Sequence, residues 1–325
     1  MLENVNTTMN VTEPSSCLSN PTAGKIGKTF AYFLIFLVSL AGNSVIGIIV
    51  YKTKTMRKPI NFLIVNMAIS DLLFPIFAIP WVIRGLYLDS WLIGGPLGQA
   101  LCKLVNFLPT VSTAVSTQSL VLIAVDRFGA VVIPLRSPLI SSKLCLFLIL
   151  ASWIGAMAVF SPYFFALKLV EYPEGLVCET HWNEVFGESS VFEKYIVSIS
   201  VGNFISLVLI ATLYIIIYLK LKSQYIPGEQ SAHAVNTGQQ RHQRQRNVFK
   251  MSFAIVLGFA VCLLPYCIFW LLNLFVSGIT TTCGFQYFTY IALFMAHANC
   301  AVNPCICFIF SGNYRQGLKT LLGFL

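Results

Sequence analysis

One acidic residue, Asp71, lies inside an otherwise uncharged apolar stretch that runs from Pro59 to Ile83. A carboxylate in the middle of a membrane is costly, so Asp71 should face the interior of a helix bundle and have a polar partner there. Oxygen-bearing side chains at comparable depth could form a cage for a hard monovalent cation, or a site for one proton. A hydrogen-bonded Asp71 with a purely structural role is the alternative. The candidate partners are Asn43, Ser112, Ser116, Asn299 and Asn303.

The elements that must position Asp71 are long apolar stretches without charge. Only 10% of the 325 residues are charged, against about 25% in soluble domains. A helix needs about 20 apolar residues to cross the hydrocarbon, and dyad alternation typical of a barrel is missing. We therefore predict an all-α membrane protein, a seven-transmembrane helix bundle. Besides the Asp71 stretch, the uncharged runs are 29–51, 104–125, 144–167, 195–219 and 251–313, and the last is long enough for two spans.

The distribution of charge predicts the orientation. Four basic residues lie between positions 52 and 58, after the first span, and only Lys25 and Lys28 lie just before it. Basic loops stay in the cytoplasm, so we expect the N-terminus outside, the C-terminus inside and a plasma-membrane location. The net charge of +9 then reflects topology and not a nucleic-acid partner. Most acids fall outside, where they could attract a cationic ligand or simply solvate a loop, and the sequence leaves both interpretations open.

The predicted outer side carries features of the secretory route. Asn6 and Asn10 begin glycosylation sequons in the N-terminal tail. The outer link before position 191 contains a Pro-Glu-Gly turn signal between apolar flanks, which predicts a β-hairpin. Four cysteines are expected outside, and four cysteines allow three pairings. These cysteines are Cys17, Cys102, Cys178 and Cys283.

On the inner side, the sequence after the last span has apolar residues at helical spacing, which predicts a short amphipathic helix in contact with membrane lipid. The third inner loop, 223–246, is rich in Gln, Ser and Gly, and we expect it to be disordered. We divide the chain into an extracellular tail (1–28), a transmembrane domain (29–310), and a cytoplasmic amphipathic helix with a short C-terminus (311–325). No nucleophile, base and orienting group occur together, so we expect no enzyme.

A set of short motifs occurs in register over the spans. The motifs are Gly42-Asn43, Asn66-x-Ala68-x-x-Asp71, Asp126-Arg127, Trp153, Pro265 and Asn303-Pro304. Together they resemble the rhodopsin-like (class A) G-protein-coupled receptors, and their order and spacing are most similar to neuropeptide receptors of the galanin, RFamide, neuropeptide Y and orexin kind. The resemblance implies an extracellular peptide ligand and a cytoplasmic heterotrimeric G protein.

The resemblance also implies roles for individual residues. Cys102 would pair with Cys178, which leaves Cys17 for Cys283. Asp126 and Arg127 would form an inner lock, and Pro134-Leu135 would enter the G protein. Asp71, Ser116 and Asn303 resemble the family's sodium site. A sodium ion is the one bound ion that we expect, and we expect no other cofactor. Pro265 and Pro304 would act as hinges. Departures from the family pattern, which put the usual switching sequence in doubt, are Leu263, Ser206 and Cys307.

The ligand is predicted less directly. Amine receptors carry an acid where Pro109 stands, and opsins need a lysine that the last span lacks. A cationic or amidated peptide would suit the acidic outer face, with Glu179 and Glu193 as counter-charges. A cation or proton transporter or channel, and a receptor that scavenges ligand without signalling, are the alternatives. The pocket candidates are Gln99, Thr110, Thr113, Tyr266, Trp270, Asn273, Gln286, Tyr290 and His297.

Overall fold

Helices long and apolar enough to cross a membrane dominate the computed structural model, which describes residues 22–88, 90–133, 139–187, 189–223, 232–276 and 282–323. Seven such helices occur in the described residues, as predicted. Helices satisfy their own backbone hydrogen bonds, so they are stable in lipid. The seven are α1 (Thr22–Lys52), α2 (Pro59–Gly85), α3 (Gly95–Val131), α4 (Ser142–Ala166), α6 (Ser189–Ser223), α7 (Ala232–Phe275) and α8 (Cys283–Phe310).

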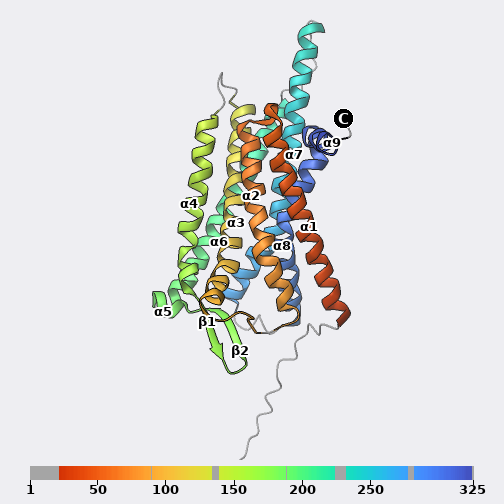
Figure 1. Ribbon diagram of the computed structural model, residues 1–325. Helices are drawn as coiled ribbons and strands as arrows, with labels where there is room; N and C mark the ends of the chain where they lie inside the picture. Colours follow the sequence, from red (N-terminus) through yellow and green to blue (C-terminus); the bar gives the residue numbers. More distant parts are fainter. Residues whose placement is uncertain are drawn as a thin grey trace, which may run out of the picture.

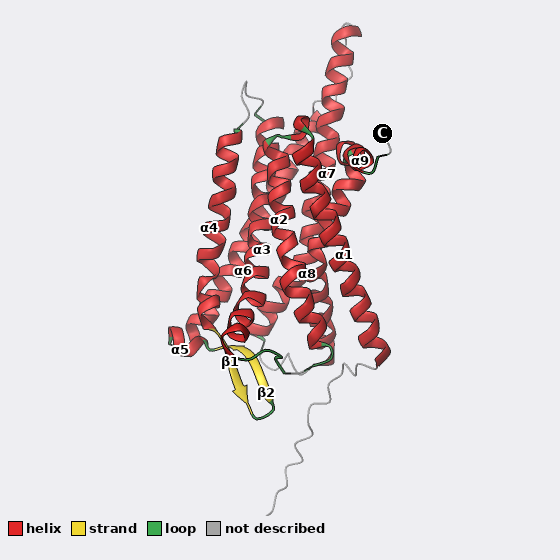
Figure 2. Ribbon diagram, viewed as in Figure 1, coloured by secondary structure: helices red, strands yellow, loops and turns green. Residues whose placement is uncertain are grey.

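The remaining elements lie at the two ends of the bundle (Figure 1). At one end, near the start of α1, the antiparallel strands β1 (Leu167–Tyr172) and β2 (Gly175–Thr180) form the predicted hairpin, and the short helix α5 (Trp182–Phe186) follows it. At the other end, the 3-10 helix η1 (Lys54–Met56) joins α1 to α2, and α9 (Gly312–Leu321) lies after the last span. Figure 2 shows this hairpin as the one β-sheet in the described part of the chain; the other regular elements there are helices.

Two predicted boundaries differ from the structure. The first span starts at Thr22 and not at Thr29. The third inner loop, expected to be disordered, is helical from Ala232 onward, and the first part of α7 projects beyond the bundle (Figure 1). Gln and Arg, which are frequent in this segment, are good helix formers. The segment therefore forms a helix although its low hydrophobicity predicted disorder.

The bundle is held together by close packing in its middle. The largest buried cluster joins α2, α3, α6 and α7 through residues such as Leu63, Leu120, Ile210 and Ile255. Helix α1 approaches α8 closely at Gly42, where an added Cβ would lie only 2.6 Å from the Cβ of Pro304. A larger residue at position 42 would therefore push the two helices apart.

The hairpin is fixed to the bundle at two points. Cys102 in α3 and Cys178 in β2 form a disulfide bond, as the resemblance implies. The backbone N–H of Trp91 donates a hydrogen bond of 2.5 Å to the carbonyl oxygen of Leu176. Cys283 is also disulfide-bonded; Cys17, its expected partner, lies outside the described residues, so that pairing stays a prediction.

Candidate functional site

The carboxylate of Asp71 lies at the junction of three helices. The residue is only 2% exposed. Ser116 of α3 donates a 2.9 Å hydrogen bond to its Oδ1, and Asn303 of α8 donates a 2.8 Å bond to its Oδ2. Both oxygens of the carboxyl group are thus occupied by donors, which is how a buried polar group avoids its desolvation cost. The structure brings together the three residues that resemble the sodium site.

A second layer of polar groups surrounds this junction. Ser70 and Ser116 share a hydrogen bond of 2.7 Å between their hydroxyls, and Ser112 donates to the carbonyl oxygen of Ser70 at 2.6 Å. On the α1 side, Ser39 donates to the backbone carbonyl of Asp71 at 3.1 Å, and Asn43 donates to the carbonyl of Cys300 at 3.0 Å. Asn43 and Ser112 therefore belong to the network, and no hydrogen bond joins either side chain to the carboxylate within the described residues.

Three buried amide oxygens of this region accept no hydrogen bond from the residues that the structure describes. They belong to Asn43, Asn299 and Asn303. Together with the carboxylate and the Ser116 hydroxyl, they give the oxygen-only donor chemistry that a hard monovalent cation prefers. The residues therefore fit the sodium ion that the resemblance implies. No group of three His, Cys, Asp or Glu side chains in the described residues is arranged to hold a metal ion.

The ion pair expected between Asp126 and Arg127 is present. Arg127 at the inner end of α3 makes an ion pair with Asp126, and its Nε lies 3.1 Å from Oδ2 of that carboxylate. The pair borders a wide cavity of about 1990 Å³ that extends to η1 and α9. Pro134 and Leu135, expected to contact the G protein, lie outside the described residues.

At the hairpin end, a second cavity of about 320 Å³ opens between the helices. Five predicted pocket residues line it, namely Thr110, Thr113, Tyr266, Trp270 and His297. Of the residues that line this pocket in the described part of the chain, none is Asp, Glu, Lys or Arg. Aromatic rings and uncharged amide and hydroxyl groups therefore provide its chemistry.

The other predicted pocket residues lie elsewhere. Gln99 anchors the hairpin, because its Oε1 accepts from the N–H of Leu169 at 2.8 Å and its Nε2 donates to the carbonyl of Leu167 at 3.2 Å. Tyr290 packs its ring beneath the Lys28 ammonium, 4.2 Å from Nζ. None of the remaining candidates lines the cavity: Glu179, Glu193, Asn273 and Gln286.

Glu179 is engaged within the hairpin. The Tyr172 hydroxyl donates to its Oε1 at 2.6 Å, and His181 Nε2 lies 2.9 Å from the same oxygen. These two contacts, the tyrosine first, lower the pKa of Glu179. On its other side, His181 Nδ1 lies 2.6 Å from Glu184, which also binds Lys168. Glu184 and Glu179 raise the pKa of the His181 imidazole because they stabilise its charged form.

Comparison with known proteins decides the family. Residues 42–306 match the family model described as "7 transmembrane receptor (rhodopsin family)". The chain belongs to this family. It is 30% identical to a QRFP-like peptide receptor of Branchiostoma floridae, over 90% of this chain and 76% of that protein. It is 28% identical to the RYamide receptor of Tribolium castaneum (98% and 88%), and 30% identical to neuropeptide FF receptor 2 of Mus musculus (89% and 70%).

The receptor's departures from the family pattern fall at different depths. Leu263 is buried in α7 and lines the hairpin-side pocket, and Cys307 is buried in α8. Ser206 is half-buried on α6 outside the pocket lining, and its hydroxyl donates to the carbonyl of Gly202 at 2.9 Å. This hydrogen bond stays within one helical turn, so Ser206 joins no other helix through it.

Several functional residues of the receptor were missed from the sequence. Asn106 and Asn203 line the pocket, and Ser39 and Ser70 complete the polar network. Position offered a signal for three of them: Ser39 lies one helical turn before Asn43, Ser70 adjoins Asp71, and Asn106 lies one turn after Cys102. Asn203 stands in an uncharged apolar span, and that isolation was its only signal.

Proposed function

We propose that the receptor binds an extracellular peptide in the hairpin-side pocket and transmits this binding to a heterotrimeric G protein at the inner cavity. The observation that carries the proposal is the arrangement of two cavities at opposite ends of one bundle, with the Asp71 network in the bundle core and the Asp126–Arg127 pair in the lining of the inner cavity. The names of the relatives, which include receptors for RYamide and neuropeptide FF, support a neuropeptide as the ligand. The hairpin end then faces outward and α9 lies in the cytoplasm of a cell whose plasma membrane the chain spans seven times.

The mechanism is a shift of population. An agonist that binds more tightly to the conformation with an open inner cavity increases the population of that conformation. A G protein that prefers the same conformation then binds more tightly in the presence of agonist, and the coupling is reciprocal. Opening requires that Arg127 be released from Asp126, because the ion pair holds the guanidinium at the cavity wall.

The pocket favours an uncharged peptide end. Its lining offers Asn106, Asn203 and Thr113 as hydrogen-bonding groups and several aromatic rings, and no cation that would neutralise a carboxylate. A free C-terminal carboxylate would lose its hydration without compensation, whereas a C-terminal amide can donate and accept. Glu193 on the outer face could pair with basic residues elsewhere in the peptide. Glu179 is a weaker candidate, because its carboxylate already contacts Tyr172 and His181.

The experiment is a screen of amidated peptides and their free-acid counterparts on cells that express the receptor, with G-protein activation as the readout. We expect at least a tenfold preference for the amide, equivalent to about 1.4 kcal/mol. Asn203→Leu should reduce amide potency, whereas Ser206→Ala, at a position of the same helix that does not line the pocket, should leave it unchanged. Free acids as potent as amides would contradict the pocket chemistry. Silence of every peptide at a well-expressed receptor would contradict peptide signalling itself.

A further inference from the structure

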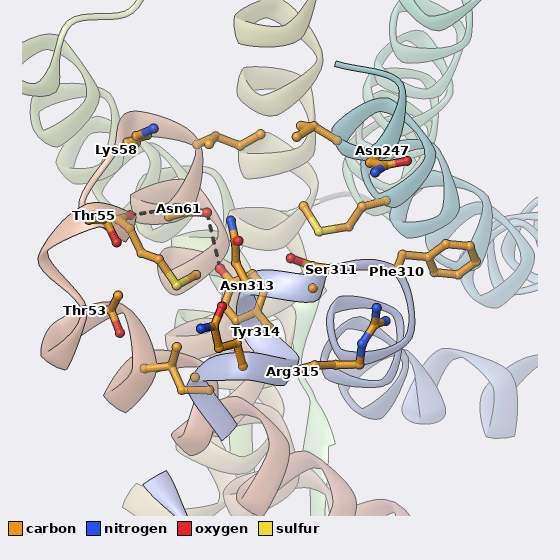
Figure 3. Close-up of a pocket in the computed structure, with 18 of the residues that line it drawn as sticks. Thr53, Thr55, Lys58, Asn61, Asn247, Phe310, Ser311, Asn313, Tyr314 and Arg315 are labelled. Atoms are coloured by element: carbon orange, nitrogen blue, oxygen red, sulfur yellow. Dashed lines mark hydrogen bonds between the residues drawn. The ribbon is translucent and has the colours of Figure 1, made fainter. Parts of the chain in front are cut away.

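The inner cavity has two distinct sides. On one side lie Arg127 and the residues of α7 from Asn247 to Met251; on the other lie the link between α1 and α2 and the start of α9. Figure 3 shows Thr55 and Lys58 of the link and Asn313 and Arg315 of α9 around this second side. We call it the link side. A G protein that contacts Arg127 occupies the first side and leaves the chemistry of the link side unexplained.

The link side carries positive charge without a neutralising acid. The cavity lining contains one acid, Asp126, and Arg127 already binds it. The lining lysines make no ion pair with any described acid. Arg57 of the same link is not among the lining residues, because its guanidinium donates to the carbonyl of Tyr51 and stacks near that ring. The lining cations of the link are Lys52, Lys54 and Lys58. Lys250 lines the α7 side, and the Arg315 guanidinium donates to the carbonyl oxygens of Phe308 and Ile309.

The link side is also held in a fixed shape. Tyr314 of α9 is buried, with 1% of its surface exposed, and its hydroxyl lies 3.4 Å from Oδ1 of Asn61. The Nδ2 of Asn61 donates to the carbonyl of Met56 at 2.6 Å, so α9, α2 and η1 are connected. The backbone of Gly317 lies so close to Ile49 that an added Cβ would be 2.5 Å from that side chain. A binding surface that is already ordered costs less to occupy.

Its position is the headgroup level of the bilayer. Lys52 is the last residue of the apolar helix α1, and η1 follows immediately. Beside this rim, Tyr51 and Ile309 are 76% and 63% exposed, so they offer an apolar surface to an acyl chain. Hydroxyl groups of Thr53, Thr55 and Ser311 line the cavity between the cations and can donate to phosphate oxygens.

We propose that the link side binds the multiply phosphorylated headgroup of an inositol phospholipid, whose acyl chains lie along α1 and the end of α8. Basic pockets at the cytoplasmic ends of transmembrane helices have the chemistry for such headgroups. Several cations that share one cavity favour a ligand with several negative charges over a lipid with a single one. The site is separate from the peptide pocket, so its occupancy does not depend on the peptide ligand.

Purified full-length receptor in phosphatidylcholine nanodiscs provides the test. The affinity for a fluorescent phosphatidylinositol bisphosphate is measured for the native receptor and for a variant with Lys52, Lys54 and Lys58 all changed to Gln. Each lysine near an anionic headgroup contributes about fivefold in affinity, so the triple variant should bind about 100-fold more weakly. The matched control changes Lys143, Lys220 and Lys222 to Gln, which lie outside the cavity lining, and it should bind within about twofold of the native receptor.

Three outcomes would overturn the proposal. An equal loss in both triple variants would show diffuse attraction to the membrane. Phosphatidylserine at matched charge that competes equally would remove the requirement for several phosphates. Soluble inositol trisphosphate that binds as tightly as the lipid would assign the site to a free phosphate. Thermal unfolding of each variant distinguishes misfolding from lost binding. Because both leaflets of a nanodisc hold the lipid, the result does not depend on receptor orientation. The measurement uses no peptide agonist, so it does not depend on the proposed peptide ligand.

Discussion

The indole of Trp153 makes a buried hydrogen bond from α4 to α2, and removing its N–H should weaken the receptor measurably. Trp153 Nε1 donates to Asn66 Oδ1 at 2.9 Å, and Asn66 Nδ2 donates to the hydroxyl of Ser119 at the same distance. Trp153→Phe keeps an aromatic ring and removes the donor. The amide of Asn66 cannot rotate to compensate, because the rotation would break its bond to Ser119 and direct an unpaired N–H at the phenyl ring.

The magnitude follows from burial. Asn66 is buried, and a buried acceptor without a partner costs about 1–3 kcal/mol. Hydrogen bonds in membrane proteins measure about 0.6 kcal/mol on average and up to about 1.7 kcal/mol. We therefore expect Trp153→Phe to lower the free energy of unfolding by about 1.5 kcal/mol, which corresponds to a Tm lower by about 3–6 °C.

The assay is thermal unfolding of purified receptor, followed by labelling of cysteines that are buried and free in the folded state, such as Cys145, Cys300 and Cys307. A double-mutant cycle with Asn66→Leu isolates the contact from the change in ring size. The coupling energy between positions 66 and 153 should be about 0.6–1.7 kcal/mol. Additivity within about 0.3 kcal/mol would refute the reasoning, since independent sites behave in that way.

Three further predictions concern the hairpin, the helix packing and the polar junction. The pKa of His181 is raised above 6.5, so its contribution to stability is complete below pH 6.5 and is lost as pH rises through the raised value. The protection factors of the hairpin amides, which are corrected for the intrinsic pH dependence of exchange, should therefore fall above that pH, and His181→Gln should make them independent of pH. Gly42→Ala should destabilise the receptor by about 1–3 kcal/mol in a thermal melt, whereas Gly47→Ala, with open space around it, should not. Sodium should raise the Tm relative to choline, and Asn303→Leu, which removes a donor to Asp71, should abolish that response.

The architecture was predictable because lipid permits so few backbone structures. Charge-free length identified all seven spans, and the turn signal before Gly175 identified the hairpin. Gly175 has a φ of +133°, a conformation that other residues rarely adopt, so the signal had a physical basis. The inner pair followed from two adjacent residues, Asp126 and Arg127. The Asp71 junction joins residues that lie far apart in the sequence and meet only in the fold.

Other contacts were invisible because they depend on elements without a sequence pattern. Glu179 was predicted to face a ligand, and His181 and Tyr172 contact it instead. Tyr172 ends the neighbouring strand of the hairpin, and His181 is the residue immediately before α5, a helix of five residues that is too short to show periodicity. Gln99 was likewise a reasonable pocket residue by its depth in α3, and only the register of β1 shows that it binds the hairpin backbone.

Packed side chains of α7 extend from one cavity to the other. The pocket lining carries no formally charged side chain in the described residues, and the inner cavity begins at a neutralised pair. One buried face of α7 reaches both sites: Met251 lines the inner cavity, Phe259 and Leu263 line the pocket, and Ile255 lies between them. These residues recur every fourth position, so they form one continuous ridge of the helix. We predict that a ligand that displaces Leu263 repacks this ridge as far as the inner cavity, because close-packed side chains shift between discrete arrangements rather than deform gradually.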